Sequence, residues 1–199
     1  MESLWDGTID GWEEPGQAER SSLLVAPVPP RAAVTDLEVV VVRSAKRRKS
    51  VSARIVGGRI EVRMPQWMSR SQEAEYVQEL VAKLERQQAT KELDLATRAA
   101  ELAGRYGLPQ PASIRWVANQ NQRWGSCSPG TSEIRITDRI AKYPQWVIDA
   151  VIVHELAHLV EPNHSKRFHE LANRYPKQER AHGFLLAMQL QADDILDLR

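Results

Sequence analysis

Residues 146–160 form one nearly continuous apolar stretch that nevertheless contains His154, Glu155 and His158. A helix that is apolar on all sides is buried in the interior of a protein, so it takes these three polar side chains inside with it. Burying such groups without partners is costly. The sequence therefore predicts a buried helix, beginning after Pro144, in which the polar groups share a common partner.

The spacing of these three residues indicates a metal ion as that partner. Residues four apart on a helix lie on one face, one turn above the other, so His154 and His158 can bind the same ion. Glu155 is next to the first histidine and can reach a water on that ion without being a ligand. The pattern predicts one Zn²⁺ per chain with Glu155 as general base. The alternative is a buried histidine–glutamate pair with no metal.

A third ligand is expected from the segment that follows the helix. We favour His164, because zinc prefers nitrogen or sulfur ligands and His164 precedes Ser165, the expected first residue of another helix. A bend over residues 161–163 would return the chain toward the ion. The other candidates are Glu161, His169, Glu170 and Cys127. The alternative for Cys127 is a small buried hydrophobic residue.

Composition limits the class of protein. The chain has 199 residues, 42% of them hydrophobic, which suits one domain with a tail. The net charge of +1 gives no global signal for a polyanionic partner. A single cysteine excludes an intramolecular disulfide and fits a reducing compartment. The first residues are acidic and unlike a signal peptide, and no apolar run approaches the ~18 residues of a membrane span. We expect a soluble, cytoplasmic protein.

The chain divides into a tail and one domain. Residues 1–33 contain four prolines and six acidic residues, a composition that buries too little surface to fold. Residues 34–199 are the expected domain, with a β-hairpin subregion at 36–65 and a helical, catalytic part at 69–199. The expected class is α+β, a small antiparallel sheet packed on several helices. We expect strands at 37–42, 51–56, 60–64, 114–117 and 133–137, and helices at 70–88, 93–106, 165–174 and 177–196, besides the helix that begins after Pro144.

The hairpin subregion is strongly basic. Between Arg43 and Arg70 there are nine basic residues and one acid, Glu61, a local charge of +8. Such a patch attracts phosphates through counterion release, so nucleic acid is a candidate partner. The alternative is that the arginines form the solvated face of the hairpin. The basic residues are Arg43, Lys46, Arg47, Arg48, Lys49, Arg54, Arg59, Arg63 and Arg70.

Three segments resemble the YgjP-like metallopeptidases, relatives of the SprT/Spartan proteases. Residues 143–171 carry the histidine pattern. An Arg-Trp-Gly-Ser-Cys element stands at 123–127, before the strand expected near residue 134, and a basic run at 47–52 is a weaker match. The resemblance implies a compact zincin-like domain of about residues 36–197. It also implies that His154, His158 and His164 bind zinc and that Glu155 is the catalytic base.

A zinc-dependent peptidase is the function that this resemblance implies, with a peptide or protein substrate. In zincin-like proteins an edge strand lines the cleft, which would be residues 133–137 here. A donor to the oxyanion is needed besides zinc, and its candidates are Arg123, Tyr175 and His182. Two other functions remain open. One is a DNA-associated protease steered by residues 43–70, and the other is a non-catalytic module stabilised by zinc.

Overall fold

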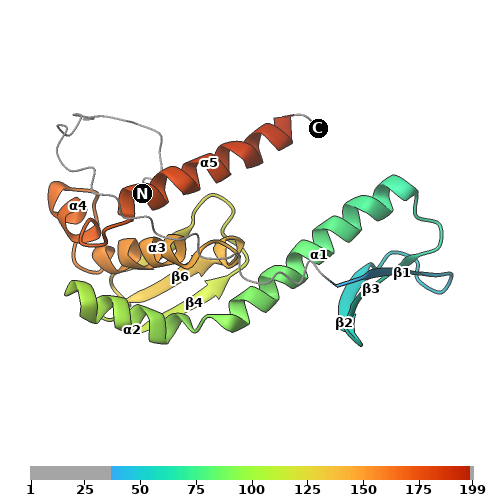
Figure 1. Ribbon diagram of the computed structural model, residues 1–199, viewed down its shortest axis with the longest axis horizontal. Coiled ribbons are helices and arrows are strands. Elements are labelled where there is room, and N and C mark those ends of the chain that lie inside the picture. Colours follow the sequence, from blue (N-terminus) through green and yellow to red (C-terminus); the bar gives the residue numbers. More distant parts are fainter. Residues whose placement is uncertain (1–36, 198–199) are drawn as a thin grey trace, which may run out of the picture.

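The structure is a computed structural model that describes residues 37–197, and side chains as far as residue 190. The tail expected over residues 1–33 lies outside the described residues. Two groups of elements lie at opposite ends of one long helix, α1 (Arg70–Glu92), as Figure 1 shows. Each group has its own cluster of buried hydrophobic side chains. We call them the N-terminal unit (β1–β3 with the first half of α1) and the C-terminal unit (α2–α5).

The N-terminal unit is a three-stranded sheet packed on α1. Its strands are β1 (Val39–Ser44), β2 (Ser52–Val56) and β3 (Arg59–Pro65), in the order β1-β3-β2. Gly57 and Gly58 join β2 to β3 with φ angles of 57° and 76°, the left-handed conformation that a two-residue hairpin turn requires. The hairpin expected from this Gly-Gly pair is therefore present. Ile60, Val62 and Met64 alternate along β3 and are buried against α1.

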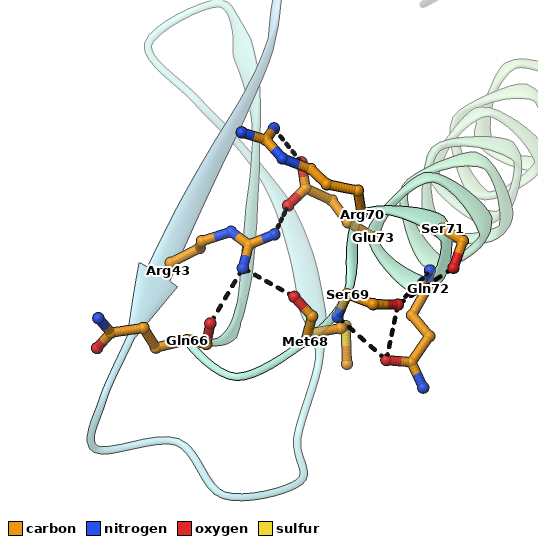
Figure 2. A network of polar contacts seen from close by, with 8 residues as sticks. All are labelled: Arg43, Gln66, Met68, Ser69, Arg70, Ser71, Gln72 and Glu73. Atoms are coloured by element: carbon orange, nitrogen blue, oxygen red, sulfur yellow. Dashed lines mark hydrogen bonds and ion pairs between the residues drawn. The ribbon is translucent and has the colours of Figure 1, made fainter.

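The start of α1 is held by its own cap and by an arginine from β1. Ser69 accepts a hydrogen bond from the backbone N–H of Gln72, and the Gln72 side chain accepts one from Ser69 N, which is the expected capping box. Arg43 donates to the carbonyls of Gln66 and Met68 at 3.0 and 2.8 Å. It also forms an ion pair with Glu73, as Figure 2 shows. These contacts fix the sheet to the helix.

The C-terminal unit wraps a second three-stranded sheet and three other α-helices around α3 (Gln145–His158). The strands are β4 (Ser113–Val117), β5 (Gly125–Ser128) and β6 (Glu133–Thr137). The other helices are α2 (Leu95–Tyr106), α4 (Lys166–Ala172) and α5 (Gln178–Asp197), and a 3-10 turn, η2 (Asp138–Ile140), follows β6. α3 contacts α2, α4, α5, β5 and β6. It is therefore buried on every side, as its composition predicts.

The class is α+β, as expected, but the sheets differ from the single antiparallel sheet of the sequence prediction. There are two sheets, and each combines one parallel pair with one antiparallel pair. β1 runs parallel to β3, and β4 runs parallel to β6. β2 pairs with β3, and β5 with β6, in antiparallel fashion. The order of the second sheet is β4-β6-β5, so β6 lies in the middle and β5 at an edge.

One buried ion pair joins α2 to α3. Arg98 donates through Nε and NH2 to the two oxygens of the Asp149 carboxylate, at 2.8 and 2.6 Å. Gln145 donates to the same carboxylate. The pairing with Asp149 raises the pKa of Arg98 above its usual value. Asp149 is the one acidic residue in the first half of the apolar stretch, and this contact explains why the interior accepts it.

Within the described residues, the structure has no helix of the length and apolar character needed to cross a membrane.

Candidate metal centre

Three imidazole rings converge beside the end of α3. His154 and His158 are one turn apart on α3 and are buried, and His164 comes from the connection to α4 and is exposed. The Nε2 atom of His154 is 3.1 Å from Nε2 of His158 and 3.3 Å from Nε2 of His164. One ligand atom from each ring lies within 4.8 Å of the others. The spacing of four residues therefore places two nitrogens together, and the bend brings the third.

A short turn returns the chain so that His164 meets the other two rings. The N–H groups of Val160 and Glu161 both donate to the Ala157 carbonyl, which ends the helix. The Glu161 carboxylate then accepts from the N–H of Asn163 at 3.3 Å. Ser165 caps α4 by accepting from the backbone N–H of Phe168. His164 is thus held between a closed turn and a capped helix, as the sequence predicted.

Phe168 of α4 packs against all three rings. Its ring centroid is 4.3 Å from that of His158, nearly parallel, and 4.6 and 4.7 Å from those of His154 and His164. The backbone carbonyl of Glu161 fixes the His158 ring, since Nδ1 of His158 is 3.1 Å from that carbonyl oxygen. In the tautomer that donates to this carbonyl, Nε2 keeps its lone pair and faces the other rings. The packing orients the nitrogens toward one point.

Burial favours the neutral form of the two imidazoles on α3, those of His154 and His158. Burial lowers the pKa of His154 well below its usual value, and the neighbouring histidines lower it further. Burial also lowers the pKa of His158, although the Glu161 backbone contact opposes this. Neutral imidazole is the form that binds a metal ion.

Glu155 is a fully buried carboxyl group without a partner. It is 0% exposed, and neither of its oxygens has a hydrogen-bond partner among the described residues. Burial raises the pKa of Glu155 to about 8, and the positive charge of Arg123 opposes that shift. A buried polar group of this kind is costly unless something compensates it. Among the described residues, the fold therefore supplies no polar partner that offsets the burial of this carboxyl group.

The edge strand β5 covers Glu155 and contributes a residue that sequence reasoning did not single out. A Cβ atom added at Gly125 would lie 2.5 Å from Glu155 Oε1, far inside the van der Waals contact distance. Only glycine leaves the carboxyl group its space. The sequence feature that could have pointed to this residue is the glycine within the Arg-Trp-Gly-Ser-Cys element. Cys127 of the same strand is close enough for Glu155 to influence its thiol, and burial raises the pKa of Cys127 to about 12.

This set of side chains is suited to a metal ion. Three imidazole nitrogens from the protein, with the ionisable carboxyl group of Glu155 next to His154 in sequence, match the three-ligand arrangement of catalytic zinc sites rather than the four-ligand structural kind. In the part of the chain that the structure describes, no carboxylate or sulfur atom belongs to the cluster. His169 and Glu170 are exposed on α4 outside it. Cys127 is likewise not a member, so the four alternatives to His164 are not brought together with the histidine pair.

Two other expectations about the site are wrong. Residues 133–137 do not form an edge strand, because β6 is paired on both sides, and the edge beside α3 is β5. Tyr175 does not face the histidines, because its hydroxyl donates to the Trp146 carbonyl at 3.0 Å, two turns before His154 along α3. Arg123 and His182 are near enough to act electrostatically on Glu155 and His154, respectively.

A family model that describes the YgjP-like metallopeptidase domain matches residues 68–185. The match covers more than half of the chain and contains all three histidines and Glu155. The chain belongs to the YgjP-like family. Membership in this family indicates a metallopeptidase, and therefore a hydrolase. Strands β1–β3 precede the matched residues, so the basic run at 47–52 lies outside the YgjP-like match. The comparison with curated proteins and that with solved structures each found no match.

Proposed function

We propose that this YgjP-like protein is a zinc-dependent peptidase in which His154, His158 and His164 hold the ion and Glu155 is the general base. The observation that carries the proposal is the unpartnered, buried carboxyl group of Glu155, which follows directly in sequence the first of three clustered imidazoles. A structural zinc site needs a fourth protein ligand and no base. The arrangement therefore favours catalysis over a stabilising role for the ion.

The proposed chemistry divides between the ion and the carboxylate. When bound, Zn²⁺ is a Lewis acid that makes a water molecule acidic enough to lose a proton near neutral pH. Glu155 would take a proton from the water while the water oxygen attacks the scissile carbonyl carbon, and would then give the proton to the leaving amine nitrogen. A dication held by the histidines would lower the raised pKa of Glu155, so that the carboxylate is ionised for this role. The C–N bond breaks, and a carboxylic acid and an amine result. Arg123 and His182 are the candidates that remain for a donor to the oxyanion.

The edge strand β5 suits an extended peptide as substrate. One side of β5 pairs with β6, and the strand contacts α3 next to Glu155. An extended segment can add to the free edge of a sheet through backbone hydrogen bonds, which give affinity with little selectivity for side chains. We therefore expect an unfolded or extended protein segment as substrate.

The Glu155→Gln variant tests the proposal. Glutamine keeps the size of the side chain and cannot accept the proton, so we expect one zinc per chain and no measurable hydrolysis of fluorescently labelled, unfolded casein. The matched control is Glu79→Gln, an exposed position on α1, which should hydrolyse casein like the unmodified protein. Retained hydrolysis in Glu155→Gln would refute the role of the base. A zinc-loaded protein that is inactive in its unmodified form on every unfolded substrate would favour the non-catalytic module.

A further inference from the structure

The nine basic residues between 43 and 70 do not form one uniform surface. Arg54 of β2 forms an ion pair with Glu61 across the hairpin at 3.2 Å, and Arg63 pairs with the same carboxylate from two residues along β3 at 2.5 Å. Arg43 pairs with Glu73 of α1, and Arg70 lies 3.7 Å from the same carboxylate. These four cations are therefore partly neutralised within the fold.

The remaining charge is concentrated in the loop between β1 and β2. Four of its seven residues are basic, consecutive in sequence at 46–49, and the loop contains no acid. Among the described residues, none of the four takes part in an ion pair. Three of them are exposed, and Arg47 is half-buried because it donates to Ser50 and Ser52. We call this segment the basic loop (residues 45–51).

An exposed tryptophan is fixed beside the basic loop. Trp67, in the connection between β3 and α1, is 63% exposed, yet its indole N–H donates to the carbonyl of Arg48 at 3.0 Å. Gln66 donates its backbone N–H to Ser44 at the base of the same loop. Figure 2 shows Arg43 bonded to the carbonyls on either side of Trp67, at Gln66 and Met68. The two loops are therefore tied together, and the indole ring is held in position in solvent.

We propose that the basic loop and Trp67 form a binding surface for single-stranded nucleic acid. The four consecutive cations match successive phosphates, which bind through charge and counterion release. The flat indole ring offers a stacking surface for an unpaired base, which single strands expose and duplexes do not. Aromatic platforms next to basic tracks are how proteins bind single strands without sequence preference.

The position of the indole N–H favours nucleic acid over a membrane surface. At a membrane interface, a tryptophan places its apolar ring toward the acyl chains, while its N–H forms hydrogen bonds in the hydrated headgroup region. The N–H of Trp67 is already bonded to Arg48, so what remains exposed is the ring. The surface also belongs to the N-terminal unit, at the opposite end of α1 from α3 and α4, as Figure 1 shows. Binding there leaves the metal centre accessible.

The test measures binding of the full chain to a fluorescent oligothymidylate of about twenty nucleotides, longer than the ~4–16 nucleotides of a typical site. Four phosphate contacts on a single strand predict a slope of about −3 for log K against log salt, and so a loss of about fifty-fold between 50 and 200 mM salt. Lys46→Gln with Lys49→Gln should roughly halve that slope. The matched control is Lys83→Gln with Lys91→Gln, two exposed lysines of α1, which should leave it unchanged.

Trp67 supplies the second readout. Trp67→Ala should weaken binding about 5- to 150-fold, the effect of losing one stacked base, while Trp67→Phe keeps a ring and should keep most of the affinity. Thermal melting shows that each variant is folded. Four outcomes overturn the proposal. They are no binding at 50 mM salt, a salt slope that is the same in both lysine pairs, oligothymidylate bound as tightly by Trp67→Ala as by the unmodified protein, or binding only to phosphatidylserine vesicles or polyglutamate.

Discussion

Gly125 approaches Glu155 so closely that a side chain of any size at position 125 would displace the carboxyl group. The β-carbon of an alanine there would lie 2.5 Å from Oε1 and 2.9 Å from Cγ and Cδ of Glu155. The strand that carries Gly125 is paired with β6 by backbone hydrogen bonds, so the strand cannot easily move away. The position of the proposed base thus depends on the absence of a side chain in the neighbouring strand.

We expect Gly125→Ala to reduce hydrolysis about 100-fold, because a displacement of about 1 Å at a reacting group has that effect. Zinc content should be unchanged, since the three candidate ligand atoms come from the histidines and none from β5. The overpacked interior should also lower the free energy of unfolding by about 1–3 kcal/mol. The matched control is Gly130→Ala, where an added β-carbon meets nothing within 4 Å. Full activity in Gly125→Ala would contradict this account of how Glu155 is placed.

The third histidine is tested by comparing two positions on either side of Phe168. Loss of a residue that only hydrogen-bonds a metal ligand typically weakens metal binding about 10–100-fold. His164→Ala removes a ligand itself and should therefore weaken zinc binding by more than that. His169→Ala should leave the affinity unchanged, because His169 is exposed outside the cluster. Competition with a chelator of known affinity gives both dissociation constants. If the two variants lose zinc equally, His164 is not a ligand.

Much of this site could be predicted from the sequence because the signal was local. The start of the helix follows from an apolar stretch that comes after a proline, and α3 begins at Gln145, directly after Pro144. The bend and the cap at Ser165 are also local, so His164 was placed correctly beside the pair. Phe168 was not singled out as the residue that packs against all three rings, because an aromatic residue in a short helix indicates core packing in general.

The strand order and the Gly125–Glu155 contact could not be predicted, because they depend on pairing between strands that are distant in sequence. The sequence of β5, Gly-Ser-Cys-Ser, has no apolar alternation, so it was not expected as a strand. Without β5, residues 133–137 were assigned to the edge of the sheet, although β6 is the central strand. The parallel pairs β1–β3 and β4–β6 were missed for the same reason, since alternation predicts a strand but not its neighbour. The Gly125–Glu155 contact joins segments 30 residues apart and exists only after that pairing.

Metal removal should destabilise the protein. A ligand present at 1,000 times its dissociation constant stabilises the folded state by about 4 kcal/mol, and each kcal/mol is worth about 2–4 °C in a chain of this size. We therefore expect a chelator to lower the melting temperature by about 8–16 °C, and added zinc to restore it. The chelator should have no such effect on a His154→Ala variant. An equal shift in both proteins would mean that the chelator acts elsewhere.

The Arg98–Asp149 pair is a stability determinant that lies away from the metal centre. Removal of Arg98 leaves a buried carboxylate without its cation, which typically costs 3–5 kcal/mol. Because Arg98 is partly exposed and Gln145 still donates to Asp149, we expect about 2–4 kcal/mol for Arg98→Ala. Denaturant unfolding measures this, with Arg105→Ala on the exposed side of α2 as control. A change below about 0.5 kcal/mol, the usual range for surface substitutions, would show that the pair is not buried in solution.

The most direct test is a crystal structure of the zinc-loaded protein with anomalous diffraction recorded at the zinc edge. We predict one peak per chain, about 2.0–2.1 Å from a nitrogen of each of His154, His158 and His164, with the Glu155 carboxylate next to the ion but not bound to it. A peak coordinated by Cys127 or directly by Glu155 in place of one of the histidines, or one located elsewhere in the chain, would contradict the account.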